Sequence, residues 1–504
     1  MPREEVENGR DDMLIDGNEV EQRRLENAVP EGFNADYLKA YYGKIFPYAD
    51  MFKWLSYGND GKHPGCDHSY FGRREFSFTL DNDIYLRFQS FNTASELENA
   101  IKEKCPFKID IGPVYSVDIK VPQFLCVLSL RGRQPSKRHA YSQGGDNVFT
   151  PVEKELVFDI DISDYDDARY CCSGADVCLE CWPLMTIAIK VIDTSLRDDF
   201  GFSHILWVYS GRRGVHCWVC DGKARRLNNE QRAAIVDYFR VYKGNENSSK
   251  KVSLVGPALH PFLVRSYTEV LKDYFEKRLL SSQNLFLNEE RFEKILEMIP
   301  DECMQVYLSL LLLNHFHLIE FLVMLRNFAA VTSELRGRWL SNKRSREEIN
   351  VARWDQLKNL LQSNKQKGQG LRRCIEEIVF TFTYPRLDME VSKHMNHLLK
   401  APFCVHPKTG RVCVPINPKN CEEFDPSAVP TLSQILALSV TCESFLGNLI
   451  LEALKEKGIV NGMEPLLEIV LDTLGILLAT SVKVLQGGDR DFLQCESSAV
   501  KELN

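Results

Sequence analysis

Two aspartates on a short apolar run are the residues whose types and spacing point most directly to chemistry. The run ELVFDIDI (155–162) alternates apolar and polar positions, which predicts a strand with Asp159 and Asp161 on one face. Side chains two residues apart on a strand lie roughly 7 Å apart, so two ionised carboxylates repel unless a cation joins them. The spacing indicates either a divalent-metal centre for phosphoryl or nucleotidyl transfer or a solvated strand face.

A basic turn follows about fifty residues later. An apolar run at 204–210 enters Gly211-Arg212-Arg213-Gly214 and continues as a second apolar run to residue 220, which predicts a strand, a tight turn and a strand. The turn brings together a hydroxyl (Ser210), two guanidinium groups (Arg212 and Arg213) and an imidazole (His216). Arginine binds phosphate in a bidentate manner. A polar hairpin tip is the alternative, but together with the aspartates the turn indicates a site for a metal-bound triphosphate.

Four cysteines lie within eleven residues just after the aspartate strand. They are Cys171, Cys172, Cys178 and Cys181. Thiolates so close together form a compact tetrahedral zinc site, and four ligands leave no open position, so the Zn2+ would be structural. A rival set combines Cys178 and Cys181 with Cys217 and Cys220, although the last two fall on a predicted strand with odd spacing and would point to opposite faces. Four unligated thiols are the remaining alternative.

Several long motifs occur along the chain in one order. They lie at 155–167, 210–221, 384–388 and 405–410, with further blocks at 41–57, 74–91 and 107–116. From about Tyr37 to Pro430 the chain resembles the small, catalytic subunit family of eukaryotic DNA primases. The resemblance implies the synthesis of short RNA primers on a single-stranded DNA template from ribonucleoside triphosphates. It also favours the first cysteine set as the zinc ligands.

The resemblance implies a role for each matching position. Asp159, Asp161 and Asp388 would hold two Mg2+ or Mn2+ ions. Glu75 and Arg87 would belong to the nucleotide site, although Glu75 could instead pair with Arg73 or Arg74. The remaining nucleotide-binding positions would be Ser210, Arg212, Arg213, His216, His397, Lys400 and His406.

A cationic stretch, VSKHMNHLLK (391–400), has the spacing of a helix. Lys393, His397 and Lys400 would then share one face. Such a face is commonly plain solvated surface, and the resemblance alone places His397 and Lys400 near nucleotide phosphates.

The expected fold is α+β: a mixed α/β catalytic domain with an inserted helix-rich subdomain and a small structural zinc motif. Helical periodicity supports helices at Asn229–Tyr242, Pro261–Leu279 and Glu289–Ile299. The expected divisions are a disordered N-terminus (1–34), a catalytic domain (35–240 and 385–430, zinc motif 171–181), a helical subdomain (241–384, atypical insert 303–331) and a divergent tail (431–504).

Three segments depart from the family pattern: Ile119–Gln134, Cys303–Val331 and the chain after about residue 436. Cys303–Val331 is apolar enough to suggest a membrane span, but its charged and polar residues are costly in lipid. A buried helix or translated non-coding sequence is the alternative. The basic stretches Arg336–Arg346 and Lys365–Arg373 are expected to be solvated surface, with template contact as the alternative.

Composition agrees with a soluble globular protein of 504 residues. The net charge of −8 excludes coating of nucleic acid by bulk electrostatics, so template contacts must use local basic patches. Sixteen cysteines and no leader peptide suggest a reducing compartment. By resemblance the partners are the large iron–sulfur primase subunit and the DNA polymerase alpha complex, in the nucleus and without a membrane. A catalytically inert structural subunit is the alternative function.

Overall fold

The computed structural model describes residues 33–119, 149–242, 252, 254, 258–299, 335–337, 339, 346–363 and 373–436. Several expectations therefore lie outside the described residues. These are the N-terminus before residue 33, nearly all of Ile119–Gln134, the insert Cys303–Val331, most of both basic stretches, and the tail after residue 436.

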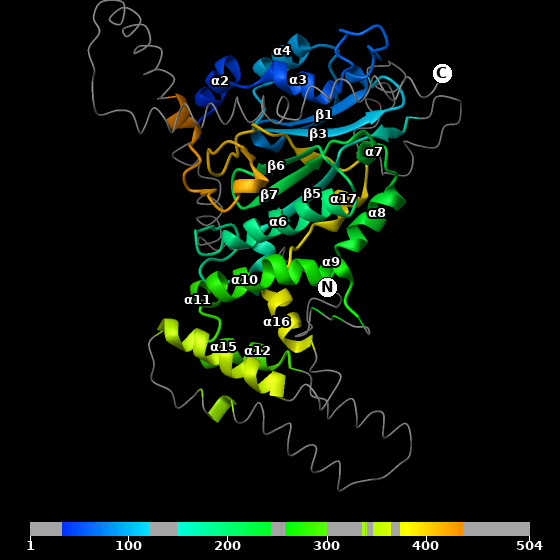
Figure 1. Cartoon of the computed structure of the whole chain (residues 1–504). Coiled ribbons are helices and arrows are strands. Elements are labelled where there is room, and N and C mark those ends of the chain that lie inside the picture. Colours follow the sequence, from blue (N-terminus) through cyan, green and yellow to red (C-terminus); the bar gives the residue numbers. More distant parts are fainter. Residues whose placement is uncertain are drawn as a thin grey trace, which may run out of the picture.

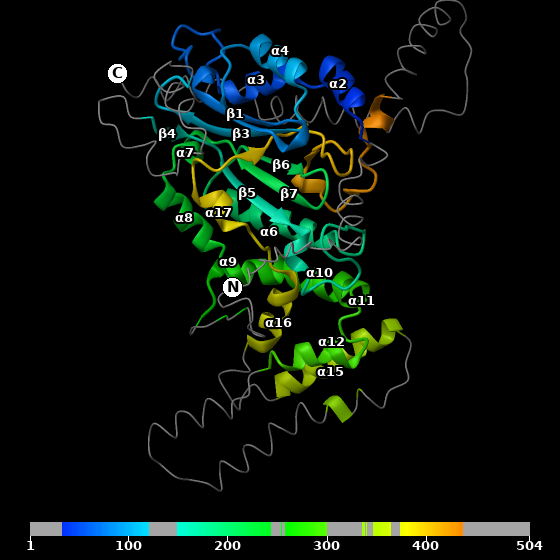
Figure 2. The ribbon, with the colours of Figure 1, turned by 180° about the vertical axis from the view of Figure 1, so that it is seen from behind.

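The first sheet is antiparallel and has the order β2-β1-β3-β4, with β8 also paired to β3. Its strands are β1 (Arg74–Thr79), β2 (Tyr85–Gln89), β3 (Lys108–Tyr115), β4 (Pro151–Glu153) and β8 (Leu399–Lys400). Three helices cover its outer side in Figures 1 and 2: α2 (Ala35–Lys44), α3 (Tyr48–Ser56) and α4 (Ala94–Lys104). The Asn34 and Thr93 side chains cap α2 and α4, as their residue types predict.

The second sheet has the order β5-β7-β6-β9 and is also antiparallel. Its strands are β5 (Leu156–Asp161), β6 (Ile205–Tyr209), β7 (Gly214–Val219) and β9 (Pro415–Ile416). The buried helix α6 (Pro183–Asp198) lies on the side away from the first sheet (Figures 1 and 2). The sequence thus correctly predicted both β5 and the hairpin β6–turn–β7.

A helix-rich part lies beyond α6, at the end of the molecule opposite α2–α4 (Figures 1 and 2). A continuous helical run contains α9 (Pro261–Ser266), the π-helical turn η4 (Tyr267–Leu271), α10 (Lys272–Tyr274), the π-helical turn η5 (Phe275–Leu279) and α11 (Leu280–Ser282). The other helices are α12 (Glu289–Leu296), α15 (Arg346–Ser363) and α16 (Cys374–Thr383). Helices α7 (Gly222–Arg225) and α8 (Asn229–Tyr238) precede this part. Helix α8, the run from α9 to η5, and α12 correspond to the three expected helices, and the α+β fold class is correct.

The expected helix over Val391–Lys400 is wrong. Helix α17 spans only Met389–Lys393, and the backbone at His394 is extended. Leu399 and Lys400 instead form β8, because strand pairing with Ile111 and Asp110 of β3 outweighs the local helical spacing. Lys393, His397 and Lys400 therefore share no helix face.

A buried ion pair joins the two sheets. Arg74, the first residue of β1, donates to both carboxylate oxygens of Glu155, the residue before β5, at 2.8 and 3.0 Å, and both side chains are 0% exposed. Tyr57 donates a third hydrogen bond to the same carboxylate, at 2.7 Å. Burial alone would raise the pKa of Glu155, but the Arg74 guanidinium and its hydrogen bonds lower it to about 2.

No helix in the described part of the chain is long and apolar enough to cross a membrane. That finding does not extend to Cys303–Val331, which lies outside the described residues.

The substitution Glu155→Gln should destabilise the protein by about 3–5 kcal/mol at pH 7, because it leaves the buried Arg74 charge uncompensated. The folded pKa of Glu155 is depressed, so its contribution should be complete above its unfolded pKa of about 4.3 and lost as the pH falls towards about 2. Urea unfolding measures the change. Glu98→Gln, at the exposed Lys102 pair, is the control and should cost about 0.5 kcal/mol or less. Equal effects would contradict the prediction.

Candidate active site and zinc motif

The strand pairing of β5 with β7 sets the two aspartates against the basic hairpin. Asp159 lies opposite His216 and Asp161 opposite Gly214. The guanidinium of Arg213 is 2.8 Å from an Asp161 carboxylate oxygen, and Nε2 of His216 is 3.5 Å from Oδ1 of Asp159. The hairpin therefore brings acidic and basic groups into one site, as the sequence predicted.

Two glycines make this close approach possible. A Cβ on Gly214 would lie 2.1 Å from the Ile160 carbonyl oxygen and 2.8 Å from Oδ1 of Asp161. Gly211 has a φ of +85°, and a Cβ there would lie 2.8 Å from the Cβ of His406. The turn between β6 and β7 consequently requires glycine at both ends.

Asp388 reaches the aspartate strand through the segment that precedes α17. Its backbone N–H donates to the Asp159 carbonyl at 3.1 Å. Arg386 anchors the same segment: it pairs with Asp167, and its guanidinium carbon lies 5.0 Å from the centroids of both the Tyr165 and Tyr242 rings. The sequence analysis did not identify Arg386 as a functional residue. Its position two residues before Asp388 was the only feature that could have indicated such a role.

The electrostatics of Asp159 suit a bound cation. Burial, together with the negative charges of Asp161 and Asp388, raises the pKa of Asp159 to about 7. Oδ1 of Asp159 is buried and receives no hydrogen bond from the described residues. One Asp388 oxygen instead accepts from the backbone N–H groups of Glu390 and Val391, capping α17. Across the described residues these three carboxylates do not form a cluster with every ligand atom within 4.8 Å of the others.

The opposite wall of the site is cationic. Lys400 donates to the Ser210 carbonyl at 2.8 Å, which ties β8 to the hairpin. Burial and the charges of Lys400, Arg212 and Arg213 lower the pKa of His406 to about 2. Burial and Lys400 likewise lower the pKa of His216 to about 3, so that ring is neutral. Such a concentration of positive potential attracts an anion.

Ser210 has a structural contact within the hairpin. Its hydroxyl accepts from the Gly214 N–H at 3.0 Å, and its own N–H donates to the Gly214 carbonyl at 2.9 Å. This serine therefore closes the turn, and that contact is independent of any ligand.

Glu75 and Arg87 are paired with each other. The Glu75 side chain is 0% exposed and accepts from Arg87 at 2.9 and 3.2 Å and from the Tyr115 hydroxyl at 3.0 Å. The alternative partners are wrong, because Arg73 pairs with Asp67 and Arg74 with Glu155.

The pairing of β1 is irregular near Glu75 with both of its neighbouring strands. The β1–β2 register shifts between residues 76 and 78, and the β1–β3 register shifts between residues 74 and 76. Phe88 has a φ of +58°, an unfavourable conformation for a bulky residue. At the other irregularity a Cβ on Gly112 would lie 2.9 Å from the Leu398 side chain and 3.0 Å from the Cβ of Glu75. Bulges of this kind re-aim side chains, here those of the Glu75–Arg87 pair.

His397 is held differently from Lys400. Its side chain is exposed, while its backbone carbonyl accepts a hydrogen bond from the buried Lys154. Burial and the charge of Arg232 lower the pKa of Lys154 to about 7. The sequence did not point to Lys154, because its local pattern does not show that the backbone of residue 397, more than two hundred residues later, contacts it.

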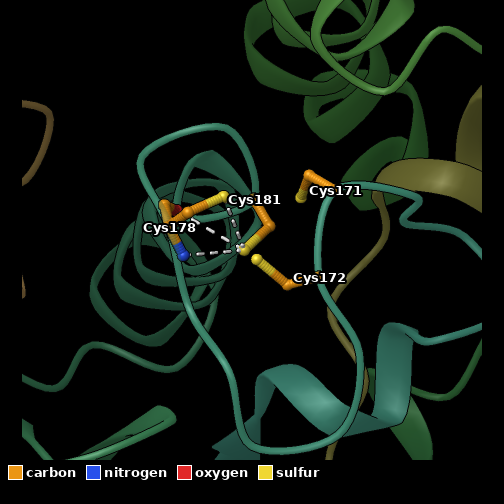
Figure 3. Close-up of side chains that lie close together, drawn as sticks. All are labelled: Cys171, Cys172, Cys178 and Cys181. Carbon is orange, nitrogen blue, oxygen red and sulfur yellow. Dashed lines mark hydrogen bonds between the residues drawn. The ribbon is translucent and has the colours of Figure 1, made fainter.

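The four cysteines of the predicted zinc motif converge (Figure 3). The sulfurs of Cys171, Cys172, Cys178 and Cys181 all lie within 4.8 Å of one another, and those of Cys178 and Cys181 are 3.9 Å apart. Tetrahedral Zn2+ with Zn–S bonds of about 2.3 Å needs sulfurs about 3.8 Å apart. The cluster therefore suits zinc.

The rival cysteine set does not assemble. Cys217 and Cys220 are buried in the core, and Cys220 accepts a hydrogen bond from Trp54 at 3.4 Å. Within the described residues, these four cysteines are the only group of three or more potential metal ligands whose ligand atoms all lie within 4.8 Å of one another: Cys171, Cys172, Cys178 and Cys181.

Acidic residues on one strand face a cationic hairpin, an arrangement that suits the transfer of a nucleotide from a metal-bound triphosphate. Residues 158–418 match the family described as DNA primase small subunit. The chain is 38% identical to the DNA primase small subunit of Drosophila melanogaster, with 80% of this chain and 81% of the relative aligned. It is 35% identical to that of Schizosaccharomyces pombe, with 84% of each aligned. The archaeal DNA primase small subunit PriS of Thermococcus sibiricus is 32% identical over 149 residues, 28% of this chain and 41% of the relative. This chain belongs to the DNA primase small subunit family, the catalytic subunits that synthesise RNA primers.

Asp159→Asn should stabilise the metal-free protein at pH 8. The folded pKa of Asp159 is about 7 and the unfolded value about 3.9, so stability should fall as the pH rises between these values. The variant should lack this slope and gain on the order of 2 kcal/mol at pH 8, since each pKa unit corresponds to about 1.4 kcal/mol and solvent screens part of it.

Thermal unfolding between pH 4 and 8, without added Mg2+ or Mn2+, measures this slope. The exposed Asp237 supplies the control Asp237→Asn, which should unfold like the parent at each pH. Added Mn2+ should stabilise the parent but not the Asp159 variant. A parent stability that does not change across this range would contradict the assignment.

Cys181→Ser should lower both the zinc content and the thermal stability, because a structural zinc site contributes folding free energy directly. Cys217→Ala should keep zinc, even though it removes a buried side chain. Elemental analysis of the purified full chain measures the metal. Loss of zinc from the Cys217 variant alone would favour the rival cysteine set.

Proposed function

We propose that the paired sheets hold a two-metal nucleotidyl-transfer centre that extends an RNA primer on a single-stranded DNA template. The observation that carries this proposal is that Asp159 and Asp161 face a cationic hairpin, while Asp388 hydrogen-bonds to the Asp159 backbone and its charge acts on the Asp159 carboxylate. Family membership supplies the reaction, and the geometry suggests which residues perform it. The presence of all three carboxylates favours an active enzyme over an inert subunit.

The carboxylates Asp159, Asp161 and Asp388 would hold two Mg2+ or Mn2+ ions. Bound there, such ions supply Lewis-acid stabilisation of the attacking primer hydroxyl and of the leaving pyrophosphate. The raised pKa of Asp159 and its buried oxygen without a hydrogen bond fit this assignment. The ion pair between Arg213 and Asp161 would open as a triphosphate arrives, since phosphate offers the arginine a stronger bidentate partner.

The cationic wall would hold the nucleotide. Arg212 and Arg213 present guanidinium groups at the turn, and Lys400 adds an ammonium group from β8. The neutral rings of His216 and His406 would donate hydrogen bonds to phosphate oxygens without adding charge. The exposed His397 and the Ser210 hydroxyl would be further contacts, while Glu75 would fix Arg87 towards the nucleotide.

This proposal treats residues 35–240 and 385–430 as the catalytic domain and 241–384 as a helical subdomain. The chain would work within a primase complex on a DNA template, as its relatives' names imply. We propose the large iron–sulfur subunit and the DNA polymerase alpha complex as its partners and the nucleus as its location. Zn2+ in the four-cysteine cluster would be structural.

Asp388→Asn should lower primer synthesis by more than about 100-fold, since a direct ligand should matter more than outer-shell partners, whose loss costs about 10–100-fold. Asparagine still caps a helix, so α17 should keep its start and thermal stability should change little. The measurement is incorporation of ribonucleotides on a single-stranded template with Mg2+ or Mn2+.

The control is Glu390→Gln, two residues further along α17 with its side chain at the surface. It should keep parental activity. An active Asp388 variant would remove this residue from the metal site and with it the two-metal assignment.

A further inference from the structure

Gln283, the residue after α11, lies against the loop that carries the zinc cysteines. Its side chain is 2% exposed, although it belongs to the helix-rich part of the chain. Its Oε1 accepts from the backbone N–H groups of Tyr170 and Cys171, at 2.7 and 3.3 Å. Its Nε2 donates to the Glu180 carbonyl at 2.7 Å. One amide thus contacts both sides of the cysteine loop.

The same amide also reaches a zinc-site sulfur. Nε2 of Gln283 donates to Sγ of Cys171 at 3.4 Å. The orientation of the amide follows from its partners, because two backbone N–H groups require an oxygen and a carbonyl requires the NH2 group. A hydrogen bond to a metal-bound thiolate tunes the ligand and holds it in place. Arg169 makes the corresponding contact to Cys181 at 3.6 Å, but from within the loop itself.

A second contact fastens Gln283 to α12. Arg291 donates to the backbone carbonyls of Gln283 and Asn284, at 3.1 and 3.2 Å. Its guanidinium carbon also lies 4.3 Å from the centroid of the Tyr170 ring, and the Lys294 ammonium lies 5.4 Å from it. Tyr170 directly precedes Cys171, so α12 packs on the residue next to a zinc ligand.

Helix α15 contacts the residues that follow Gln283. Asn350, 0% exposed, accepts from the Phe286 N–H at 2.9 Å and donates to the Asn284 side chain at 3.3 Å. The stretch after α11 is therefore held on one side by the cysteine loop and on the other by α12 and α15.

We propose that Gln283 is an outer-shell residue of the zinc site and that, through it, the bound zinc sets how the helix-rich part docks on the catalytic sheets. Zinc orders the cysteine loop, and the loop presents two N–H groups, one carbonyl and one thiolate to a single glutamine from the helices. Coupling free energy is reciprocal between linked sites. Zinc therefore stabilises the packing of α11 and α12, and that packing strengthens zinc binding. This inference goes beyond primer synthesis and rests only on zinc occupying the four-cysteine cluster.

The first test is Gln283→Glu in the full chain. Glutamate keeps the shape and can still accept from Tyr170 and Cys171, but a carboxylate oxygen replaces the NH2 group that faces the thiolate and the Glu180 carbonyl. Zinc affinity, measured by competition with a chromogenic chelator under native conditions, should fall by about 10- to 100-fold. In Co2+-loaded protein, the sulfur-to-cobalt charge-transfer band should shift, because the hydrogen bond to a ligand sulfur has gone.

The matched control is Gln356→Glu in α15. Gln356 is half-buried and accepts a hydrogen bond from Trp339 at 2.8 Å inside the helix-rich part. Among the described residues, no hydrogen bond joins its side chain to the cysteine loop. The Gln356 variant should leave the zinc affinity and the Co2+ spectrum at parental values. An equal loss of zinc affinity in both variants, or parental affinity in Gln283→Glu, would overturn the proposal, and so would a parent chain that contains no zinc.

The reciprocal test uses the unsubstituted chain, so it does not depend on a variant that folds. Removing zinc with a chelator should increase amide hydrogen exchange in α11 and α12 as well as in the cysteine loop. Exchange in α2 and α4, which lie across the first sheet, should be unchanged. Loss of protection confined to the cysteine loop would show that zinc acts locally and would overturn the coupling.

Discussion

The buried ion pair between Arg74 and Glu155 is the constraint on which the active site depends. One partner begins β1 next to Glu75, and the other leads into β5, four residues before Asp159. Both charges are fully buried, so each neutralises the other. Separating them would leave an uncompensated charge in the core, which is costly in free energy. The ion pair therefore fixes the relative position of the two sheets close to the residues that must act together. Tyr57, the residue after α3, donates a further hydrogen bond to the Glu155 carboxylate.

Local departures from regular structure then refine the geometry. Glycine at 211 and 214 lets the basic turn approach Asp161 and the loop of His406 more closely than any other residue would. Register shifts on both sides of β1 turn the Glu75–Arg87 pair out of regular strand geometry. The left-handed backbone of Phe88 is part of the same irregularity, and strained conformations of this kind persist only where the surrounding structure requires them.

Opposed charges give the centre its character before any ligand binds. Burial and the neighbouring carboxylates raise the pKa of Asp159, while burial and the cationic groups opposite lower the pKa values of His216 and His406. The acidic wall therefore has an excess of negative charge and the cationic wall an excess of positive charge. The Arg213–Asp161 ion pair neutralises only part of each excess. A cation on one wall and a triphosphate on the other would relieve both imbalances, which gives our proposed function an electrostatic basis.

The sequence by itself determined the parts whose residues are neighbours in the chain: the aspartate strand, the basic hairpin and the four-cysteine loop. Strand alternation and cysteine spacing are local, so they could be predicted correctly. Tertiary structure alone decided that Asp388 meets Asp159, that Lys400 lies on a strand and not a helix, and that Glu75 pairs with Arg87. Resemblance had grouped Asp388 with Asp159, but no periodicity could have. The physical reason is that pairing across sheets and burial of charge depend on segments far apart in the chain, whose free energy of contact exceeds local propensity.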